Sequence, residues 1–203
     1  MRAAFRGLEV DAREMLMGGK DERLSARAII VMGVSGSGKS TLASLLGRQL
    51  GSPFLEGDAF HSSANIAKMS RGEPLTDADR WPWLDKLGEA IGASVRREGT
   101  AVAACSALKR AYRDRLRAAI GVPTSFIMLE VGRDELVRRL NSRPDHYMPA
   151  NLIDSQLAIL ERPGADERAT MIHSAVAPEH ELEQALQWLA SEHTDVRRPA
   201  KAG

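Results

Sequence analysis

The sequence has very little cysteine and no long apolar run, and each absence excludes a class of protein. Cys105 is the single cysteine among 203 residues, so an internal disulfide is excluded and a reducing compartment fits. No apolar run approaches the roughly 18 residues of a membrane-spanning helix. The N-terminal stretch MRAAFRGLEVDAREML carries acidic residues and lacks the apolar core and cleavage site of a signal peptide. The sequence therefore predicts a cytoplasmic protein without a membrane partner.

An excess of charge of one sign is also missing. The chain has 28 basic and 27 acidic residues and a formal net charge of +1, so no global basic field draws it to nucleic acid. Aromatic and basic residues do not alternate as they do in modules that bind single strands. The five histidines lack the H-x-x-x-H or C-x-x-C type of spacing of zinc ligands. These absences favour a small molecule, and no nucleic acid, as the partner.

What the sequence does contain is a phosphate-binding motif. Residues 33–41 read GVSGSGKST and match the pattern G-x-x-x-x-G-K-[ST]. An apolar run at residues 28–32 precedes the motif and a helical pattern follows it, which is the context that the motif requires. Its glycines allow positive φ, so successive backbone N–H groups can approach phosphate oxygens. The motif predicts a nucleotide site formed by Gly33, Val34, Ser35, Gly36, Ser37, Gly38, Lys39, Ser40 and Thr41.

Two side chains of this motif have specific expected roles. Lys39 should reach the β- and γ-phosphates of a nucleotide and act as a catalytic residue, and the hydroxyl of Ser40 is placed to ligate Mg²⁺. The helix that begins near Lys39 directs its unsatisfied N–H groups and the positive end of its dipole at the same anion. The expected metal is therefore the Mg²⁺ that accompanies the nucleotide.

Strand and helix patterns alternate along the chain. Gly51 and Gly99 are placed to end two helices, and Thr76 to open the second of them. The alternation predicts an α/β fold in which helices cover both faces of a parallel sheet. The predicted strands are residues 28–32, 53–56, 101–105, 125–131 and 171–174. We expect one domain at residues 27–190, an N-terminal extension at 1–26, with Met15 or Met17 as an alternative start, and a polar C-terminal tail at 191–203.

Three longer blocks carry a resemblance to a known family. They are GDAFHSSANIAKMSRGEPLTDADRWPWL at residues 57–84, CSALKRAYRDRLR at 105–117 and SQLAILERPGADE at 155–167. Together with the phosphate-binding motif, they make the chain resemble the gluconate kinases, a family of P-loop small-molecule kinases, from about Ile29 to Pro163. The block at residues 57–84 is the most specific, because its GD-x-FH, N-x-x-KM, G-x-PL and D-x-DR-x-PWL elements distinguish this family from shikimate and nucleotide kinases.

The resemblance implies a fold and a reaction. The fold is the P-loop kinase fold, a five-stranded parallel sheet of order 2-3-1-4-5 with helices on both faces and a mobile lid. The reaction is phosphoryl transfer from ATP to the 6-hydroxyl of D-gluconate, and the family commonly forms homodimers. The chain has Tyr147 after His146 where the family usually has phenylalanine.

Two other functions remain as alternatives. A pocket that recognises a carboxylate and hydroxyl groups could belong to a kinase for another small sugar acid. The second alternative is a nucleotide-dependent switch protein. Against the switch, the predicted strand at residues 101–105 does not end in the aspartate that holds Mg²⁺ in motor and switch ATPases, and the sequence has no N-K-x-D guanine motif.

A polyhydroxy acid needs a carboxylate near its attacking hydroxyl and cations near its own carboxylate. Asp58, at the predicted carboxyl end of a strand, is the candidate catalytic base and substrate ligand, although aspartate is also common as a turn or cap residue. Arg113 could instead belong to a solvated basic helix face, and Arg80 could be held by Asp77 or Asp79. The resemblance and the charge requirement point to six further substrate-binding residues: His61, Asn65, Lys68, Arg80, Lys109 and Arg113.

A segment with two prolines interrupts the alternation and predicts a lid at about residues 143–150. An arginine on a closing loop can meet the charge that develops on the transferred phosphoryl group, so Arg143 is a further catalytic candidate. Arg139, one helical turn earlier, is a candidate nucleotide ligand, with a surface salt bridge as the alternative. Trp81, Trp83 and Cys105 are expected to be packing residues.

Overall fold

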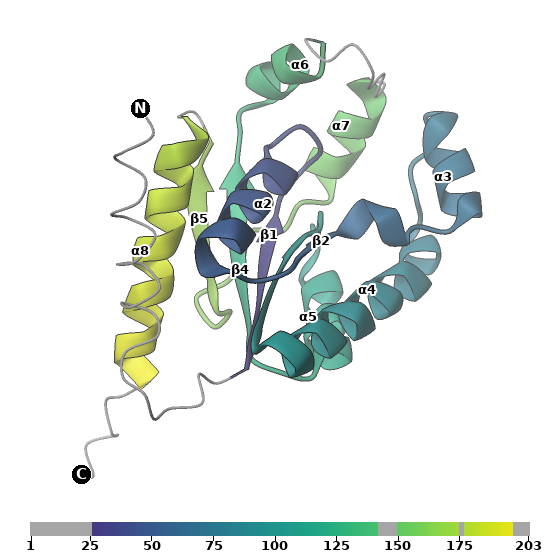
Figure 1. Ribbon diagram of the computed structural model, residues 1–203. Coiled ribbons are helices and arrows are strands. Elements are labelled where there is room, and N and C mark those ends of the chain that lie inside the picture. The colour runs from purple at the N-terminus through teal and green to yellow at the C-terminus, as the bar shows by residue number, and fades with distance from the viewer. Residues whose placement is uncertain (1–25, 142–149, 175–176, 197–203) are drawn as a thin grey trace.

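A five-stranded parallel sheet forms the centre of the molecule (Figure 1). The computed structural model describes residues 26–141, 150–174 and 177–196. The strands lie in the order β2-β3-β1-β4-β5, which confirms the sheet order implied by the family resemblance. Their bounds are β1 Arg27–Met32, β2 Phe54–Glu56, β3 Thr100–Ala104, β4 Thr124–Glu130 and β5 Ala169–His173.

Strand β1 is central because its apolar run is suited to burial on both faces. All six of its residues are buried, and it pairs in parallel with β3 on one side and β4 on the other. The side chains alternate between two cores: Ile29 and Val31 face one, and Ile30 and Met32 face the other. The carboxyl end of β1 therefore delivers the phosphate-binding motif to the middle of one sheet edge.

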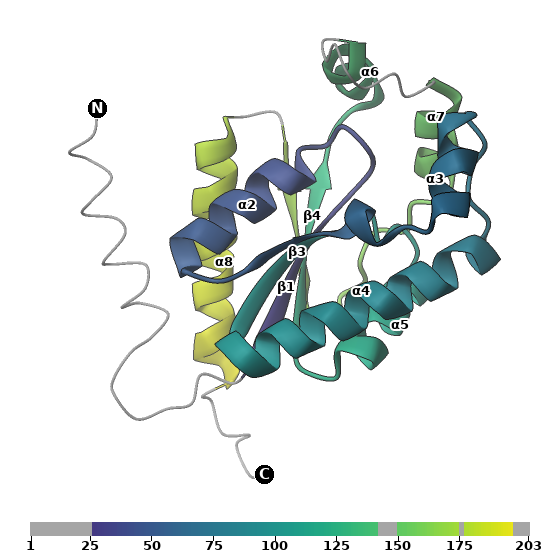
Figure 2. The same ribbon diagram turned by 45° about the vertical axis from the view of Figure 1, so that its right-hand side comes forward.

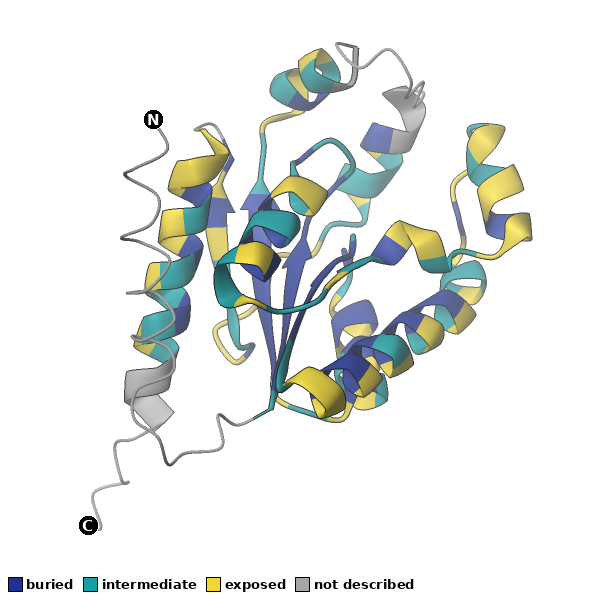
Figure 3. Cartoon of the chain, in the orientation of Figure 1, coloured by how far each residue is buried: buried dark blue, intermediate teal, exposed yellow. Residues whose placement is uncertain are grey.

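Two pairs of helices cover the sheet, as the alternation predicted. Figures 1 and 2 show α2 and α8 on one face and α4 and α5 on the other. The three central strands β1, β3 and β4 are almost entirely buried, whereas the edge strands β2 and β5 are partly exposed and α3 exposes much of its surface (Figure 3). The helices are α2 Lys39–Leu50, the 3₁₀ turn η1 Gly57–Phe60, α3 Ser63–Ser70, α4 Asp77–Glu98, α5 Arg110–Ile120, α6 Arg133–Asn141, α7 Ala150–Ala158 and α8 Pro178–Val196.

The ends of the first two long helices follow the local sequence signals. Gly51, in the left-handed region, caps the carboxyl end of α2, and Gly99 caps that of α4. At the start of α4, Thr76 and Asp79 form a reciprocal capping box: each side chain accepts from the other residue's backbone N–H, at 3.3 Å and 2.7 Å. The three predictions for these ends are confirmed.

The C-terminal helix extends into the segment that the sequence predicted as a polar tail. Helix α8 continues to Val196, past the expected domain end at residue 190. Its last turns are tied to the sheet, because the carboxylate of Glu192 accepts hydrogen bonds from Arg168 and from Ser125 of β4. Polar composition alone did not reveal this anchor. The N-terminal extension, apart from residue 26, and residues 143–149 of the expected lid lie outside the described residues.

Within the described ranges, no helix combines the length and the apolar character needed to cross a membrane.

Candidate phosphoryl-transfer site

The loop between β1 and α2 has the backbone geometry of a phosphate cradle. Gly33, Gly36 and Gly38 adopt φ of 140°, 81° and 102°, values that strongly favour glycine. At Gly33 a Cβ atom would also meet the carbonyl oxygen of Leu129 at 2.8 Å and Oγ of Ser37 at 2.9 Å. Glycine at position 33 is thus required by both the backbone angle and the space.

The same loop fits the triphosphate of a nucleotide. Helix α2 begins at Lys39 and has no acidic residue in its first turn, so its positive N-terminal end is open to an anion. The ammonium group of Lys39 lies over the loop and donates to the carbonyl of Val34 at 3.0 Å. The hydroxyl of Ser37 is buried inside the loop and has no hydrogen-bond partner among the described residues. The donors and the charge match those of a phosphate site.

Mg²⁺ at such a site would depend mainly on the nucleotide. In the part of the chain that the structure describes, no cluster of three or more histidine, cysteine, aspartate or glutamate residues could hold a metal ion. Mg²⁺ typically keeps several waters and binds through few protein ligands plus phosphates. Ser40, in the first turn of α2, is the side chain that would reach it.

Arg139 of α6 contacts the cradle from the side of β5. Its guanidinium donates to the carbonyl of Ser37 at 3.3 Å and to the hydroxyl of Ser174 at 3.1 Å, and its Nε donates to Glu135 at 2.6 Å. The salt bridge expected as an alternative therefore exists, yet the guanidinium also lies against the phosphate loop. Glu181 of α8 accepts from Ser174 at 2.5 Å, and burial raises the pKa of this carboxyl group.

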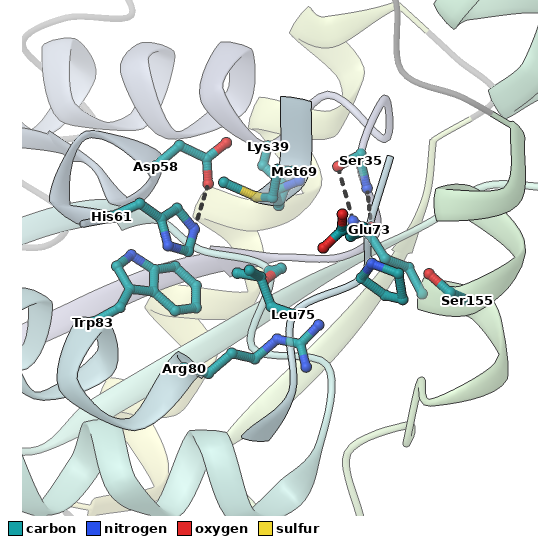
Figure 4. A pocket seen from close by; sticks show the side chains of 13 residues that line it. Ser35, Lys39, Asp58, His61, Met69, Glu73, Leu75, Arg80, Trp83 and Ser155 are labelled. Atoms are coloured by element: carbon teal, nitrogen blue, oxygen red, sulfur yellow. Dashed lines mark hydrogen bonds and ion pairs between the residues drawn. The ribbon is translucent and has the colours of Figure 1, made fainter. Parts of the chain in front are cut away.

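A pocket opens beside the cradle, between the phosphate loop, η1 and the start of α4 (Figure 4). Lys39 of the loop and Asp58 of η1 both border it, so the sheet brings the two expected catalytic side chains to one cavity. Arg80 reaches it from α4. The lining residues are Ser35, Lys39, Asp58, His61, Met69, Glu73, Pro74, Leu75, Arg80, Trp83, Ser106, Ser155 and Gln156.

Asp58 and His61 form a polar pair on the pocket wall. Asp58 is largely exposed, with 74% of its side chain accessible, whereas only 5% of the His61 side chain is accessible. Nε2 of His61 lies 4.0 Å from Oδ1 of Asp58. The His61 ring stacks on Trp83 with a centroid distance of 4.1 Å, and the indole N–H of Trp83 donates to the carbonyl of Gly57 at 2.8 Å. Burial lowers the pKa of His61, and the nearby Arg80 adds to this effect against the opposing charge of Asp58.

Arg80 is a cation at the pocket whose side chain is fixed from behind. Its guanidinium donates to the hydroxyl of Tyr112 at 3.1 Å and lies 3.9 Å from the carboxylate of Asp77. The alternative that Asp77 holds Arg80 is thus partly realised, but the arginine still borders the cavity. It is the most direct candidate for a substrate carboxylate.

The expected substrate ligands Lys68 and Lys109 do not border the pocket, because acidic residues of the first turn of α4 hold them. Lys68 donates to Asp79 at 2.7 Å, and Lys109 donates to both carboxylate oxygens of Asp77 at 2.8 Å. The hydrogen bond from Lys68 is the largest cause that lowers the pKa of Asp79, and the bond from Lys109 is the largest for Asp77. Both lysines therefore fasten neighbouring elements to α4.

Asn65, a further expected ligand, lies behind the pocket wall. It is buried, and its side-chain amide donates to the carbonyl of Asp79 at 2.9 Å. The same nitrogen lies 3.4 Å from Nδ1 of His61. Asn65 thus touches the residue that lines the cavity and does not line the cavity itself.

The expectation for Arg113 is corrected by the structure. Its side chain is fully buried and forms two hydrogen bonds of 2.7 Å to the carboxylate of Glu167. It also donates to the carbonyl of Glu161 at 3.0 Å. Arg113 is therefore neither a substrate ligand nor part of a solvated helix face, but the anchor of the segment between α7 and β5.

Several residues that line the cavity were not among the predicted site residues, and Gln156 is one of them. Gln156 of α7 accepts a hydrogen bond from the backbone N–H of Ser35 at 2.7 Å and donates to its hydroxyl at 3.2 Å. The residue lies in the SQLAILERPGADE block, so the family resemblance was the available signal.

Three further residues were singled out from the sequence. Trp83 was expected to be a packing residue, and it is buried, but its ring also stacks against the His61 ring at the cavity. Cys105 is buried as expected, and desolvation raises the pKa of its thiol to about 12. Arg143 lies outside the described residues.

The sheet order, the glycine cradle with Lys39 and the adjoining pocket define a P-loop phosphotransferase. A family described as an AAA domain matches residues 29–163. The chain is 45% identical to a gluconokinase of Gluconobacter oxydans over 83% of this chain and 94% of that protein, and 41% identical to the thermosensitive gluconokinase of Escherichia coli over 71% and 77%.

Solved structures give the same result. A gluconokinase structure from Sinorhizobium meliloti 1021 matches with a TM-score of 0.77 and 40% identity, covering 84% of this chain and 95% of that one. A sugar kinase structure from Janibacter sp. HTCC2649 matches with a TM-score of 0.75 and 45% identity over 81% and 94%. The chain belongs to the gluconokinase family.

Proposed function

We propose that the protein phosphorylates D-gluconate at its 6-hydroxyl with ATP and releases 6-phospho-D-gluconate and ADP. The observation that carries this proposal is the single pocket that brings together Lys39 of the phosphate loop, Asp58 and Arg80. The pocket thus joins a phosphate cradle to a carboxylate and a cation, the groups that a hydroxyl nucleophile on a sugar acid requires. The similarity to gluconokinases supports the choice of acid.

Each of these residues has a separate role in the reaction. Bound Mg-ATP supplies the phosphoryl group and the metal charge that offsets its oxygens. Asp58 orients the attacking hydroxyl and takes its proton as the new oxygen–phosphorus bond forms and the bond to ADP breaks. Lys39 places a positive charge on the transferred group, and Arg80 binds the carboxylate of the sugar acid.

The remaining assignments are proposals that rest on the sequence. Mg²⁺ is held by Ser40 and the phosphates, Arg139 contacts the nucleotide, and Arg143 meets the charge that develops on the phosphoryl group. We further infer a homodimer in the cytoplasm, from the family resemblance and from the reducing compartment that the single cysteine fits. Light scattering of the purified protein would measure its mass in solution, and a monomeric mass at all concentrations would contradict the dimer.

A substrate panel tests the reaction. The protein is incubated with Mg-ATP and a set of aldonic, uronic and keto acids, and ³¹P–¹H NMR locates the phosphate on each product. We expect D-gluconate to have the highest kcat/KM and the phosphate to be on its 6-oxygen. A higher kcat/KM for another acid would favour the alternative kinase, and ATP hydrolysis that needs no acid would favour a switch protein.

A further inference from the structure

The ring of His61 is held in a fixed orientation by its neighbours. The ring is stacked on Trp83, with an interplanar angle of 18°, and Trp83 is itself fixed by its hydrogen bond to Gly57. Figure 4 shows the His61 ring between Trp83 and Asp58, at the edge of the cavity. Because only 5% of the side chain is accessible, the chemistry of its two nitrogens is set by protein neighbours.

One of those neighbours identifies which nitrogen carries the proton. The terminal atom of Asn65 that faces the carbonyl of Asp79, at 2.9 Å, must be the amide nitrogen, because a carbonyl oxygen can only accept. That nitrogen has a second hydrogen, and Nδ1 of His61 lies 3.4 Å from it. Nδ1 therefore accepts, and in a neutral imidazole the proton is then on Nε2.

The protonated nitrogen faces Asp58. Nε2 lies 4.0 Å from Oδ1, about 1 Å beyond hydrogen-bond distance. Asp58 comes from the short turn η1 and is 74% accessible, so packing does not fix its rotamer and a small rotation brings the carboxylate to the N–H. Its orientation thus depends on polar neighbours. In a doubly protonated His61, Nδ1 would also carry a hydrogen, and this N–H would face the N–H of the Asn65 amide. Because two donors repel each other, the contact favours the neutral ring.

We propose that Asn65 fixes His61 in the tautomer with its proton on Nε2, and that this N–H positions the carboxylate of Asp58 toward the hydroxyl that it deprotonates. His61 is then a positioning residue that acts through Asp58, and Asn65 is the residue that fixes its tautomer. The part that concerns Asp58 rests on the proposed kinase function, whereas the tautomer does not.

NMR of the unliganded protein tests the tautomer without any reference to activity. Two-bond ¹H–¹⁵N correlations distinguish the nitrogen that bears the proton, and His61→Phe identifies the signals of His61. We expect a neutral ring protonated on Nε2 at pH 7, and a loss of that preference in Asn65→Leu, which removes the donor at similar volume. A ring protonated on Nδ1 in the unmodified protein would overturn the proposal.

Two substitutions at position 61 then distinguish the effect of the aromatic ring on kcat from the effect of the N–H donor. His61→Phe keeps an aromatic ring over Trp83 without a donor, and His61→Gln keeps an N–H donor near the position of Nε2 without the ring. With gluconate as substrate, His61→Phe should lower kcat by about 10- to 100-fold, the range for a lost hydrogen bond to a charged group. His61→Gln should recover a large part of that loss, and KM should change by less than about threefold in both variants.

A double-mutant cycle decides whether His61 acts through Asp58. If it does, His61→Phe should have little further effect on kcat in an Asp58→Asn background, because the carboxylate it positions is gone. Equal losses in both backgrounds, or equal kcat for the Phe and Gln variants, would overturn the positioning role. Absence of sugar-acid phosphorylation by the unmodified protein would instead contradict the proposed function, and the NMR result would still decide the tautomer.

Discussion

Single residues at this site divide into those that border the cavity and those that hold them. The local pattern GVSGSGKST was sufficient to predict the cradle, because each glycine has its role through its own backbone angle. The local sequence could not predict that Lys68 and Lys109 pair with acidic residues of α4 and do not border the cavity. Lys109 is paired with Asp77, 32 positions earlier in the chain, and such a partner is chosen by tertiary contacts that no local pattern encodes.

Asp58→Asn should lower kcat for gluconate phosphorylation by about 10² to 10⁴, the usual range for an acid–base group. The amide keeps the size of the side chain but cannot accept the proton of the hydroxyl. Stopped-flow single-turnover measurements would report the chemical step directly. Asp85→Asn is the matched control, because Asp85 lies on α4 and pairs with Arg115 outside the cavity, so its kcat should remain that of the unmodified protein. A change confined to KM in Asp58→Asn would make Asp58 a binding residue.

Elements with strong local signals were predictable, and the short polar ones were not. Helix α4 has a capping box at its start and glycine at its end, and apolar residues at helical spacing lie between them. Helix α3 spans eight residues with a single buried member, Asn65, so it has no apolar stripe to reveal it. It forms because Ser62 caps it and because its amide and ammonium groups bind the start of α4.

The segment between α7 and β5 is fastened by one buried carboxylate. Glu167 is 2% accessible and accepts hydrogen bonds from Arg113 and Arg117. Hydrogen bonding to Arg113 lowers the pKa of Glu167 from 4.5 to about 2 against the effect of burial. Because the folded-state pKa is depressed, the stabilisation is present above the unfolded pKa, near pH 4.5, and is lost as the pH falls toward about 2.

Glu167→Gln should therefore lower the free energy of unfolding at neutral pH by about 3 kcal/mol, at about 1.4 kcal/mol per pKa unit. The difference from the unmodified protein should shrink at about pH 2.5, where Glu167 of the unmodified protein is close to protonation. Urea unfolding of both proteins at both pH values measures this difference in the free energy of unfolding. Asp166→Asn, which removes an exposed pair with Arg110, should cost less than about 1 kcal/mol. If Glu167→Gln lowers the free energy of unfolding by the same amount at both pH values, the stabilisation does not come from the ionised carboxylate of Glu167.

At the scale of the whole molecule, the alternation of strands and helices gave the α/β class, but the sheet order came from the family resemblance. Alternation alone does not state which strands are neighbours, whereas the blocks at residues 57–84 and 105–117 indicated one family and hence one order. The site follows from that order. Because β1 lies between β3 and β4, the phosphate loop lies beside the segments that leave β3 and β4, and η1 meets the loop at the pocket.

The folded state should be stabilised as a whole by the nucleotide, since the cradle exists only when β1 and α2 are in place. At a Mg-ATP concentration of about 100 Kd the gain is about 2.7 kcal/mol, which for a domain of this size raises Tm by about 5 to 10 °C. Calorimetry of the unmodified protein with and without Mg-ATP measures this shift. Removal of Mg²⁺ with EDTA should reduce it, because the phosphates then bring uncompensated charge to the loop.

Lys39→Ala should lose most of this shift at the same Mg-ATP concentration while its Tm without nucleotide stays close to that of the unmodified protein. Lys39 contacts the loop carbonyl of Val34 and belongs to none of the apolar clusters, so its charge serves the phosphates more than the fold. Lys86→Ala, an exposed position on α4, should keep the full shift. If the same Mg-ATP concentration raises the Tm of Lys39→Ala as much as that of the unmodified protein, binding does not depend on the Lys39 charge, and the assignment of Lys39 to the β- and γ-phosphates is wrong.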